Sequence, residues 1–180
     1  MKALLDACVL YPTVTREVLL SVAKEGLFTP LWSPRILEEW ARAARKLGPE
    51  GEPQARAEIA LLRANWPAAE VKPNESDLAR LWLPDEHDIH VLAAAIAGSA
   101  DILVTFNAQD FPRNTLAEEG LDRDGPDHFL FTFWQQEPEK VAAAVARVHA
   151  EAERLSGQPW DLRKLLKKAR LPRLGKALAS

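Results

Sequence analysis

Short apolar runs alternate with longer amphipathic stretches along the chain. Lys2–Leu5 and Ile102–Thr105 are apolar runs of the length expected for buried strands. Between them, apolar residues recur every three or four positions over Pro12–Gly26, Ser33–Leu47 and Gln54–Asn65, which predicts amphipathic helices. Strands that alternate with helices indicate βαβ units and a mostly parallel sheet.

The pattern continues to the C-terminus with one further short strand and several helices. The small apolar residues of Asp88–Ala97 predict a tightly packed helix that leads into the strand at Ile102. Trp40 shares a helical face with Ile36 and Leu37, which predicts a core position. The other expected elements are a strand over Ala69–Val71 and helices over Glu75–Leu81, Leu116–Gly120, Pro138–Leu155 and the tail from Pro159, where Leu162, Leu165, Leu166 and Leu171 form the apolar side. Asp127–Gln135 is compatible with the start of a strand or of a helix, and we favour a helix.

Length and composition fit one compact α/β domain with a helical appendage. The chain has 180 residues, of which 47% are hydrophobic and 27% are charged, so neither disorder nor a membrane protein is indicated. We predict a domain over residues 1–155 and a basic amphipathic extension over residues 156–180. Asp6 interrupts any signal-peptide apolar region, and the single cysteine, Cys8, excludes an internal disulfide. These features predict a cytoplasmic protein.

The charge of the chain is unevenly distributed. The net charge is −3, but Gly157–Ser180 contains seven basic residues and one acid, which leaves the remainder at −9. An acidic body beside a basic element fits a metal-dependent nuclease, in which carboxylates bind cations and a separate patch binds phosphates. A solvated helix face is the plainer interpretation of the basic run alone.

Polar side chains gather where the predicted strands end. Asp6 ends the first strand, Asn107 and Asp110 follow the strand over Ile102–Thr105, and Asp88 begins the helix before that strand. In open parallel sheets, ligands bind in the crevice at the carboxyl ends of the strands. We therefore expect these side chains to lie near one another.

The helix that is predicted to begin at Ser33 contributes two further carboxylates. Glu38 and Glu39 are adjacent, and neighbouring helical positions point about 100° apart, so one of the two must face solvent. Converging carboxylates repel each other unless a cation neutralises them, and oxygen ligands suit Mg²⁺ or Mn²⁺. This set of residues fits metal-assisted hydrolysis of a phosphodiester. Taken singly, Asp6 is as compatible with an Asx turn or a helix cap as with a metal site, and Asp88 is as compatible with a helix N-cap as with a metal site.

Four segments resemble, in order, the motifs of PIN domains. Leu4–Leu10 is similar to an apolar strand followed by Asp-x-Asn/Ser-x-Leu, and Ile36–Trp40 to an apolar stretch ending in a helix-borne Glu. Asp85–Ala95 resembles an Asp that opens an Ala-rich helix, and Ile102–Phe111 resembles strand-Thr-x-Asn/Asp-x-x-x-Phe. The resemblance extends over about Lys2–Pro112 and is closest to bacterial toxin-type, VapC-like proteins.

The resemblance implies a three-layer α/β sandwich, with helices on both faces of a mostly parallel sheet and the C-terminal helical extension outside it. It also implies an acidic pocket that binds Mg²⁺ or Mn²⁺, cleavage of single-stranded RNA, a small antitoxin as partner, and a homodimer. We favour Glu39 over Glu38 because it ends its motif beside Trp40. The implied catalytic residues are Asp6, Glu39, Asp88 and Asn107, and the implied metal ligands are Asp6, Glu39, Asp88 and, as a substitute for Asn107, Asp110.

Several features limit the resemblance or compete with it. Cys8 stands where the family usually has Asn or Ser, and a thiol is a poor Mg²⁺ ligand, so we expect a small buried residue there. A haloacid-dehalogenase-like phosphatase requires Asp-x-Asp-x-Thr, and Cys8 and Leu10 occupy the second and third of those positions. His87 and His90 are expected on a helix surface. The serious alternative is a PIN-like scaffold with a weakened site that acts as a binding or regulatory module.

Overall fold

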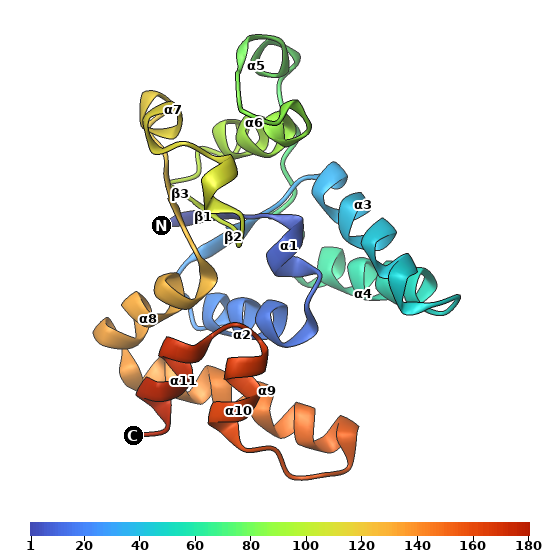
Figure 1. Ribbon diagram of the computed structural model, residues 1–180, viewed down its shortest axis with the longest axis vertical. Coiled ribbons are helices and arrows are strands. Elements are labelled where there is room, and N and C mark those ends of the chain that lie inside the picture. The colour runs from blue at the N-terminus through green and yellow to red at the C-terminus, as the bar shows by residue number, and fades with distance from the viewer. The chain divides into compact units, whose positions relative to one another are not determined.

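The computed structural model describes all residues, Met1–Ser180, and the chain divides into two compact units (Figure 1). The sheet unit comprises Met1–Tyr11 and Thr29–Asp124, and the helical unit comprises Pro12–Phe28 and Gly125–Ser180. The boundary that we predict between residues 155 and 156 stays a prediction.

The sheet unit is built on four parallel strands. They are β1 (Lys2–Leu5), β2 (Thr29–Leu31), β3 (Ile102–Val104) and β4 (Asp122–Asp124), in the spatial order β2-β1-β3-β4. In register, Leu4 of the central strand pairs with Leu31 on one side and Leu103 on the other. The predicted α/β fold with a parallel central sheet is confirmed.

Two strands were not predicted, and both lie at the edges of the sheet. β2 is three residues long and contains Pro30, while β4 is Asp-Arg-Asp. Neither has the apolar run of a buried strand, and their position follows from backbone pairing alone. The strand predicted over Ala69–Val71 is reduced to an isolated bridge between Trp32 and Glu70.

Two of the six α-helices of the sheet unit are capped by a side chain, the first helix by Asp6 and the second by Ser33. The Ser33 hydroxyl accepts a hydrogen bond from the Ile36 amide at 3.1 Å, with Pro34 in the first turn. The next long helix begins at Gly51, three residues before its predicted start, because the missing side chain leaves room for the carbonyl oxygen of Ala44. The helices are α1 (Ala7–Leu10), α3 (Pro34–Ala43), α4 (Gly51–Asn65), α5 (Glu75–Arg80), α6 (Ile89–Ala97) and α7 (Arg113–Glu118), with 3₁₀ turns η1 (Ala44–Leu47), η2 (Glu86–Asp88) and η3 (Ala108–Asp110).

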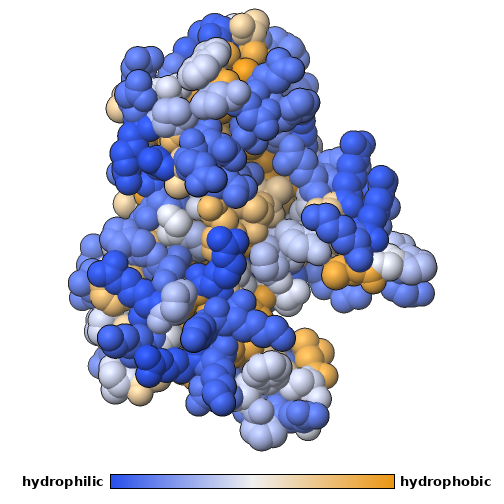
Figure 2. Space-filling model, viewed as in Figure 1, coloured by the Kyte–Doolittle hydropathy of each residue, from blue (hydrophilic) through white to orange (hydrophobic).

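The core of the sheet unit lies between the strands and the apolar faces of these helices. α6 packs against β1 and β3, and its residues Ala93–Ala95 are fully buried because small side chains allow close approach. Trp40 is 2% exposed, so its predicted place in the core is confirmed. Hydrophilic residues cover most of the surface that is visible in Figure 2.

The helical unit consists of α2 (Thr13–Lys24), α8 (Pro126–Gln136), α9 (Pro138–Ser156), α10 (Leu162–Lys168) and α11 (Pro172–Leu178). α9 packs along α2, and α11 packs on α8. The tail predicted as one amphipathic element is two helices, because Pro172 begins a new one. Leu165, Leu166 and Leu171 are buried, whereas Leu162 is partly exposed. No helix in the chain has the length and apolar character needed to cross a membrane.

Candidate metal centre

Asp6 directly follows the central strand β1 and is held by two hydrogen bonds. Its Oδ1 accepts from the Ala7 amide at 2.8 Å, and its Oδ2 accepts from the Thr105 hydroxyl at 2.9 Å. Burial raises the pKa of Asp6, the hydrogen bonds from Thr105 and Ala7 lower it, and the negative charge of Glu39 raises it again. The net upward shift in pKa means that the surroundings oppose the charge of this carboxylate.

Thr105 was not among the predicted site residues, although it lies within the fourth motif. It is fully buried at the end of β3, where its hydroxyl donates to Asp6 and accepts from the Asn107 amide at 3.0 Å. A Thr directly after a buried strand, beside the strand that ends in Asp6, is the signal that could have identified it. Thr105 fixes the orientation of Asp6 across the two central strands.

Cys8 lies against the same pair of residues. Its Sγ is 3.3 Å from the Thr105 hydroxyl and 3.6 Å from Oδ2 of Asp6, and it accepts a hydrogen bond from the Phe106 amide at 3.3 Å. Burial, followed by the charge of Asp6, raises the pKa of the Cys8 thiol to about 11. Cys8 is therefore a neutral supporting residue at the position where PIN domains usually have Asn or Ser, not a thiolate nucleophile.

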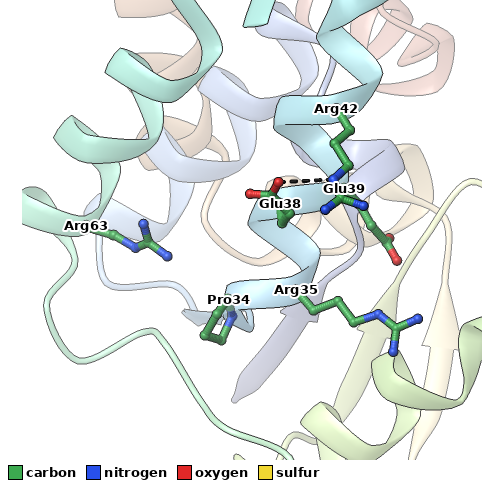
Figure 3. A pocket seen from close by; sticks show the side chains of 6 residues that line it. All are labelled: Pro34, Arg35, Glu38, Glu39, Arg42 and Arg63. Carbon is green, nitrogen blue, oxygen red and sulfur yellow. Dashed lines mark hydrogen bonds and ion pairs between the residues drawn. The ribbon is translucent and has the colours of Figure 1, made fainter. Parts of the chain in front are cut away.

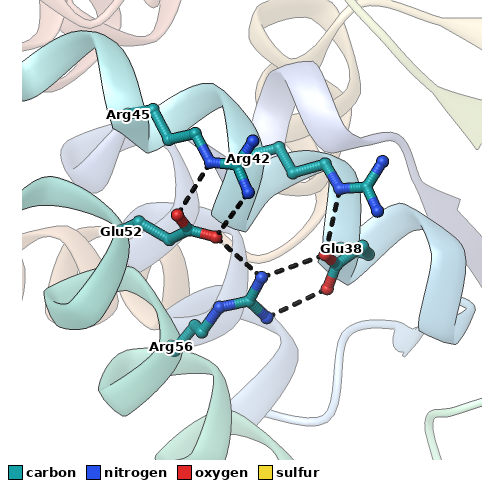
Figure 4. A network of polar contacts seen from close by, with 5 residues as sticks. All are labelled: Glu38, Arg42, Arg45, Glu52 and Arg56. Carbon is teal, nitrogen blue, oxygen red and sulfur yellow. Dashed lines mark hydrogen bonds and ion pairs between the residues drawn. The ribbon is translucent and has the colours of Figure 1, made fainter.

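Glu38 and Glu39 have different surroundings. Glu38 accepts hydrogen bonds from Arg56 at 2.9 Å and from Arg42 at 3.0 Å, and these bonds lower its pKa to about 2 (Figure 4). Arg56 also contacts Glu52, which makes Glu38 part of a surface ion network. Glu39 is outside this network, so it is the carboxylate of the pair that no arginine neutralises.

His90 is 3% exposed, so the expectation that it lies on a helix surface is wrong. Its Nε2 lies 2.6 Å from Oε1 of Glu39, but the alignment is not that of a hydrogen bond, and neither ring nitrogen has a hydrogen-bond partner. The apolar residues around it in α6, a helix that is apolar on all sides, were the signal of its burial. His87 is exposed as expected, with Nδ1 3.0 Å from Asp85.

Asp88 occupies the N-cap position of α6, but its side chain forms no capping hydrogen bond. The capping role in this segment belongs to Asp85, whose side chain accepts from the His87 amide at 2.9 Å. The pKa of Asp88 is raised to about 6, first by burial and then by like charges. The carboxylates responsible, in decreasing order of effect, are Asp6, Asp85, Asp110 and Glu39.

The two residues expected after β3 differ in their relation to this centre. Asp110 is partly buried in η3, and its charge acts on Asp88. Asn107 is exposed, and its hydrogen bond to Thr105 comes from its backbone amide and not from its side chain. The structure therefore brings Asp110 near Asp88, and a catalytic role for the Asn107 side chain stays a prediction.

The chemistry of these donors fits a hard divalent cation. Asp6, Glu39, Asp88 and Asp110 supply oxygen donors, and mutual repulsion contributes to the raised pKa of Asp6 and of Asp88. Mg²⁺ and Mn²⁺ prefer such ligands. As the side chains stand, no three or more His, Cys, Asp or Glu residues are close enough to hold one ion. Side-chain movement is thus needed for them to share a cation.

A shallow pocket of about 700 Å³ lies along α3 next to this centre (Figure 3). Glu39 lines the pocket and is also one of the four carboxylates of the candidate metal centre. The remaining lining residues are mainly basic: Pro34, Arg35, Glu38, Arg42 and Arg63.

Comparison with known proteins identifies the family. Among solved structures, the fold is similar to that of VapBC-1 from nontypeable Haemophilus influenzae, with 17% sequence identity, a TM-score of 0.48, and coverage of 70% of this chain and 98% of that chain. The comparison with curated proteins gave no match. The family model of the PIN domain matches residues 2–109, which include Asp6, Glu39, Asp88 and Thr105. With that match, the resemblance inferred from the motifs is confirmed, and the chain belongs to the PIN-domain family.

Proposed function

We propose that this protein is a divalent-metal-dependent endoribonuclease that uses Mg²⁺ or Mn²⁺. Asp6, Glu39, Asp88 and Asp110 are the proposed ligands, and Asn107 is the remaining proposed catalytic residue. The observation that supports the proposal best is the pKa of Asp88, which is raised to about 6 first by burial and then by the combined charge of its carboxylate neighbours. Such like-charge strain is typical of sites that a cation completes.

The residues of the chain prepare the centre in different ways. Asp6 is fixed in position by Thr105 and Ala7, whereas Glu39 is partly exposed and lies against His90, from which it would have to turn to reach a shared cation. Asp88 is ionised above about pH 6, where it can act as a ligand. When bound, the cation would activate water and stabilise the charge that develops on the phosphodiester.

The biological role that we propose is that of a toxin. The four motifs and the membership in the PIN family support a cytoplasmic ribonuclease that is inhibited by a small antitoxin and that forms a homodimer. The alternative is a binding or regulatory module without strong catalysis. It is favoured by the lack of a preformed set of three ligands around one point.

Cleavage of single-stranded RNA, with and without a chelator, separates the two functions. Glu39→Gln and Glu38→Gln form a matched pair on α3, because the side chains are adjacent and the same charge is removed. We expect Glu39→Gln to abolish metal-dependent cleavage and Glu38→Gln to retain it, since Glu38 is bound by arginines. Equal activity of the two variants, or no metal-dependent cleavage by the unmodified protein, would refute the proposal.

A further inference from the structure

The pocket along α3 contains three arginines, two of which are neutralised by acidic partners. Arg42 lies 3.0 Å from Glu38, and Arg63 lies 2.8 Å from Glu70. Arg35 is exposed and forms neither a hydrogen bond nor an ion pair with another protein group. Arg35 is thus the one cation of the pocket whose donors are all available to a ligand.

Arg35 and Glu39 lie on the same face of α3. They are four residues apart, which places them one turn from each other and about 6 Å apart along the helix axis. Figure 3 shows that both side chains extend to the same side of the helix. An anionic group bound by Arg35 would therefore lie next to the carboxylate centre.

Because the centre is negatively charged, a positive side chain beside it would help an anionic ligand to bind. Asp6, Glu39 and Asp88 repel any polyanion that approaches without a compensating positive charge. A guanidinium offers paired donors in a plane that matches two phosphate oxygens. Arg35 is also in the first turn of α3, where the positive end of the helix dipole favours an anion.

We propose that this pocket binds the backbone of single-stranded RNA, with Arg35 donating to a phosphate beside the scissile bond. The proposal rests on the proposed function, because it assigns a substrate-positioning residue to the same centre. A volume of about 700 Å³ is within the range of small-ligand pockets and accommodates a nucleotide unit of one strand. Contact with phosphate carries no base information, so the effect of Arg35 is the same for different RNA sequences.

RNA binding that is measured in the presence of a chelator tests the proposal without requiring cleavage. Fluorescence anisotropy of labelled single-stranded oligoribonucleotides is recorded for the full chain at several salt concentrations. Arg35→Ala should weaken binding roughly fivefold to tenfold for every sequence and reduce the slope of log K against log salt by about 0.7, as expected for one lost phosphate contact. Arg35→Lys should recover part of the affinity because the charge remains while the paired donors are lost.

Arg113→Ala is the matched control. Arg113 is another exposed arginine of the sheet unit, but it pairs with Asp122 at 2.9 Å and does not line the pocket. We expect this variant to bind RNA like the unmodified protein. Both variants should keep the rise in melting temperature that Mn²⁺ produces, because neither residue is a proposed ligand.

The outcomes distinguish this inference from the proposed function. Unchanged affinity and salt slope in Arg35→Ala, or equal losses in Arg35→Ala and Arg113→Ala, would overturn the role of the pocket even if the protein cleaves RNA. Binding that depends on Arg35 in a protein without metal-dependent cleavage would support the pocket and refute the nuclease. Tighter Arg35-dependent binding of duplex than of single-stranded RNA would overturn the assigned substrate class.

Discussion

Replacing Asp88 by Asn removes one of the repelling charges at the centre while it preserves the size of the side chain. Asp88 forms no capping bond that the substitution would break. In the metal-free protein, we therefore expect Asp88→Asn to be more stable than the unmodified chain at neutral pH. In the presence of Mg²⁺ or Mn²⁺ the order should reverse, because the variant has lost a proposed ligand.

The size of the effect follows from the pKa of Asp88. A rise from 3.8 to about 6 corresponds to at most about 3 kcal/mol, and solvent screening at a partly exposed side chain reduces this to roughly 1–2 kcal/mol. The pKa of Asp88 is higher in the folded state than in the unfolded state. Below about pH 4 the carboxyl group is mostly protonated in both states, so it does not lower the free energy of unfolding there. Stability is then lost between about pH 4 and pH 6, and the loss stays constant at higher pH.

Urea denaturation of both proteins in a chelator, at several pH values, measures this difference. The difference in unfolding free energy between variant and unmodified chain should grow from about pH 4 to pH 6 and then level off. Other titrating groups cancel because both proteins contain them. A cation at a hundredfold excess over its dissociation constant should add about 2.7 kcal/mol to the unmodified chain and little to the variant.

One set of results would show that the reasoning is wrong. If Asp88→Asn is no more stable than the unmodified chain at neutral pH in chelator, the carboxylates do not repel as described. If the variant also responds to cations and cleaves RNA normally, Asp88 is not part of a metal centre.

Three further expectations concern the supporting residues and the tail. Thr105→Val removes the hydroxyl that donates to Asp6, so the pKa of Asp6 should rise further and nuclease activity should fall, most strongly at low pH, in a pH–rate profile. Cys8, with its pKa raised to about 11, should react with iodoacetamide at neutral pH far more slowly in the native protein than in urea, and equal rates would contradict its burial. Truncation after Ser156 should lower the melting temperature markedly, because the lost side chains of Leu165, Leu166, Leu171 and Leu174 are buried at about 1.5–3 kcal/mol each; an unchanged melting temperature would contradict the packing described for α10 and α11.

The elements that could be predicted from the sequence are those with strong local signals. β1 and β3 are the apolar runs, and α3 begins where Ser33 and Pro34 indicate. The edge strands β2 and β4 were missed because Pro30 and an Asp-Arg-Asp segment have no strand pattern of their own, and only pairing with neighbours makes them strands.

Part of the candidate site could likewise be predicted from the sequence. Asp6 and Asp88 are found from the ends of a strand and a helix, which are visible in the sequence. The choice between Glu38 and Glu39 depends on Arg56, which is distant in sequence and lies beside Glu38 after α3 and α4 have packed together. The burial of His90 and the bond from Thr105 to Asp6 also form through tertiary packing, although the apolar residues of α6 and the position of Thr105 after β3 are local signals of them.

The bond from Thr105 to Asp6 joins residues that are 99 positions apart in the chain. During synthesis Asp6 leaves the ribosome long before Thr105, and β1 cannot pair with β3 until the latter has been made. Asp88 and Asp110 also arrive late. The centre thus cannot be assembled before Asp110 has been made, and a growing chain stays without the complete set of carboxylates until more than half of its length has been translated. For the ribonuclease function that we propose, this order of synthesis delays activity until the chain has been made as far as Asp110.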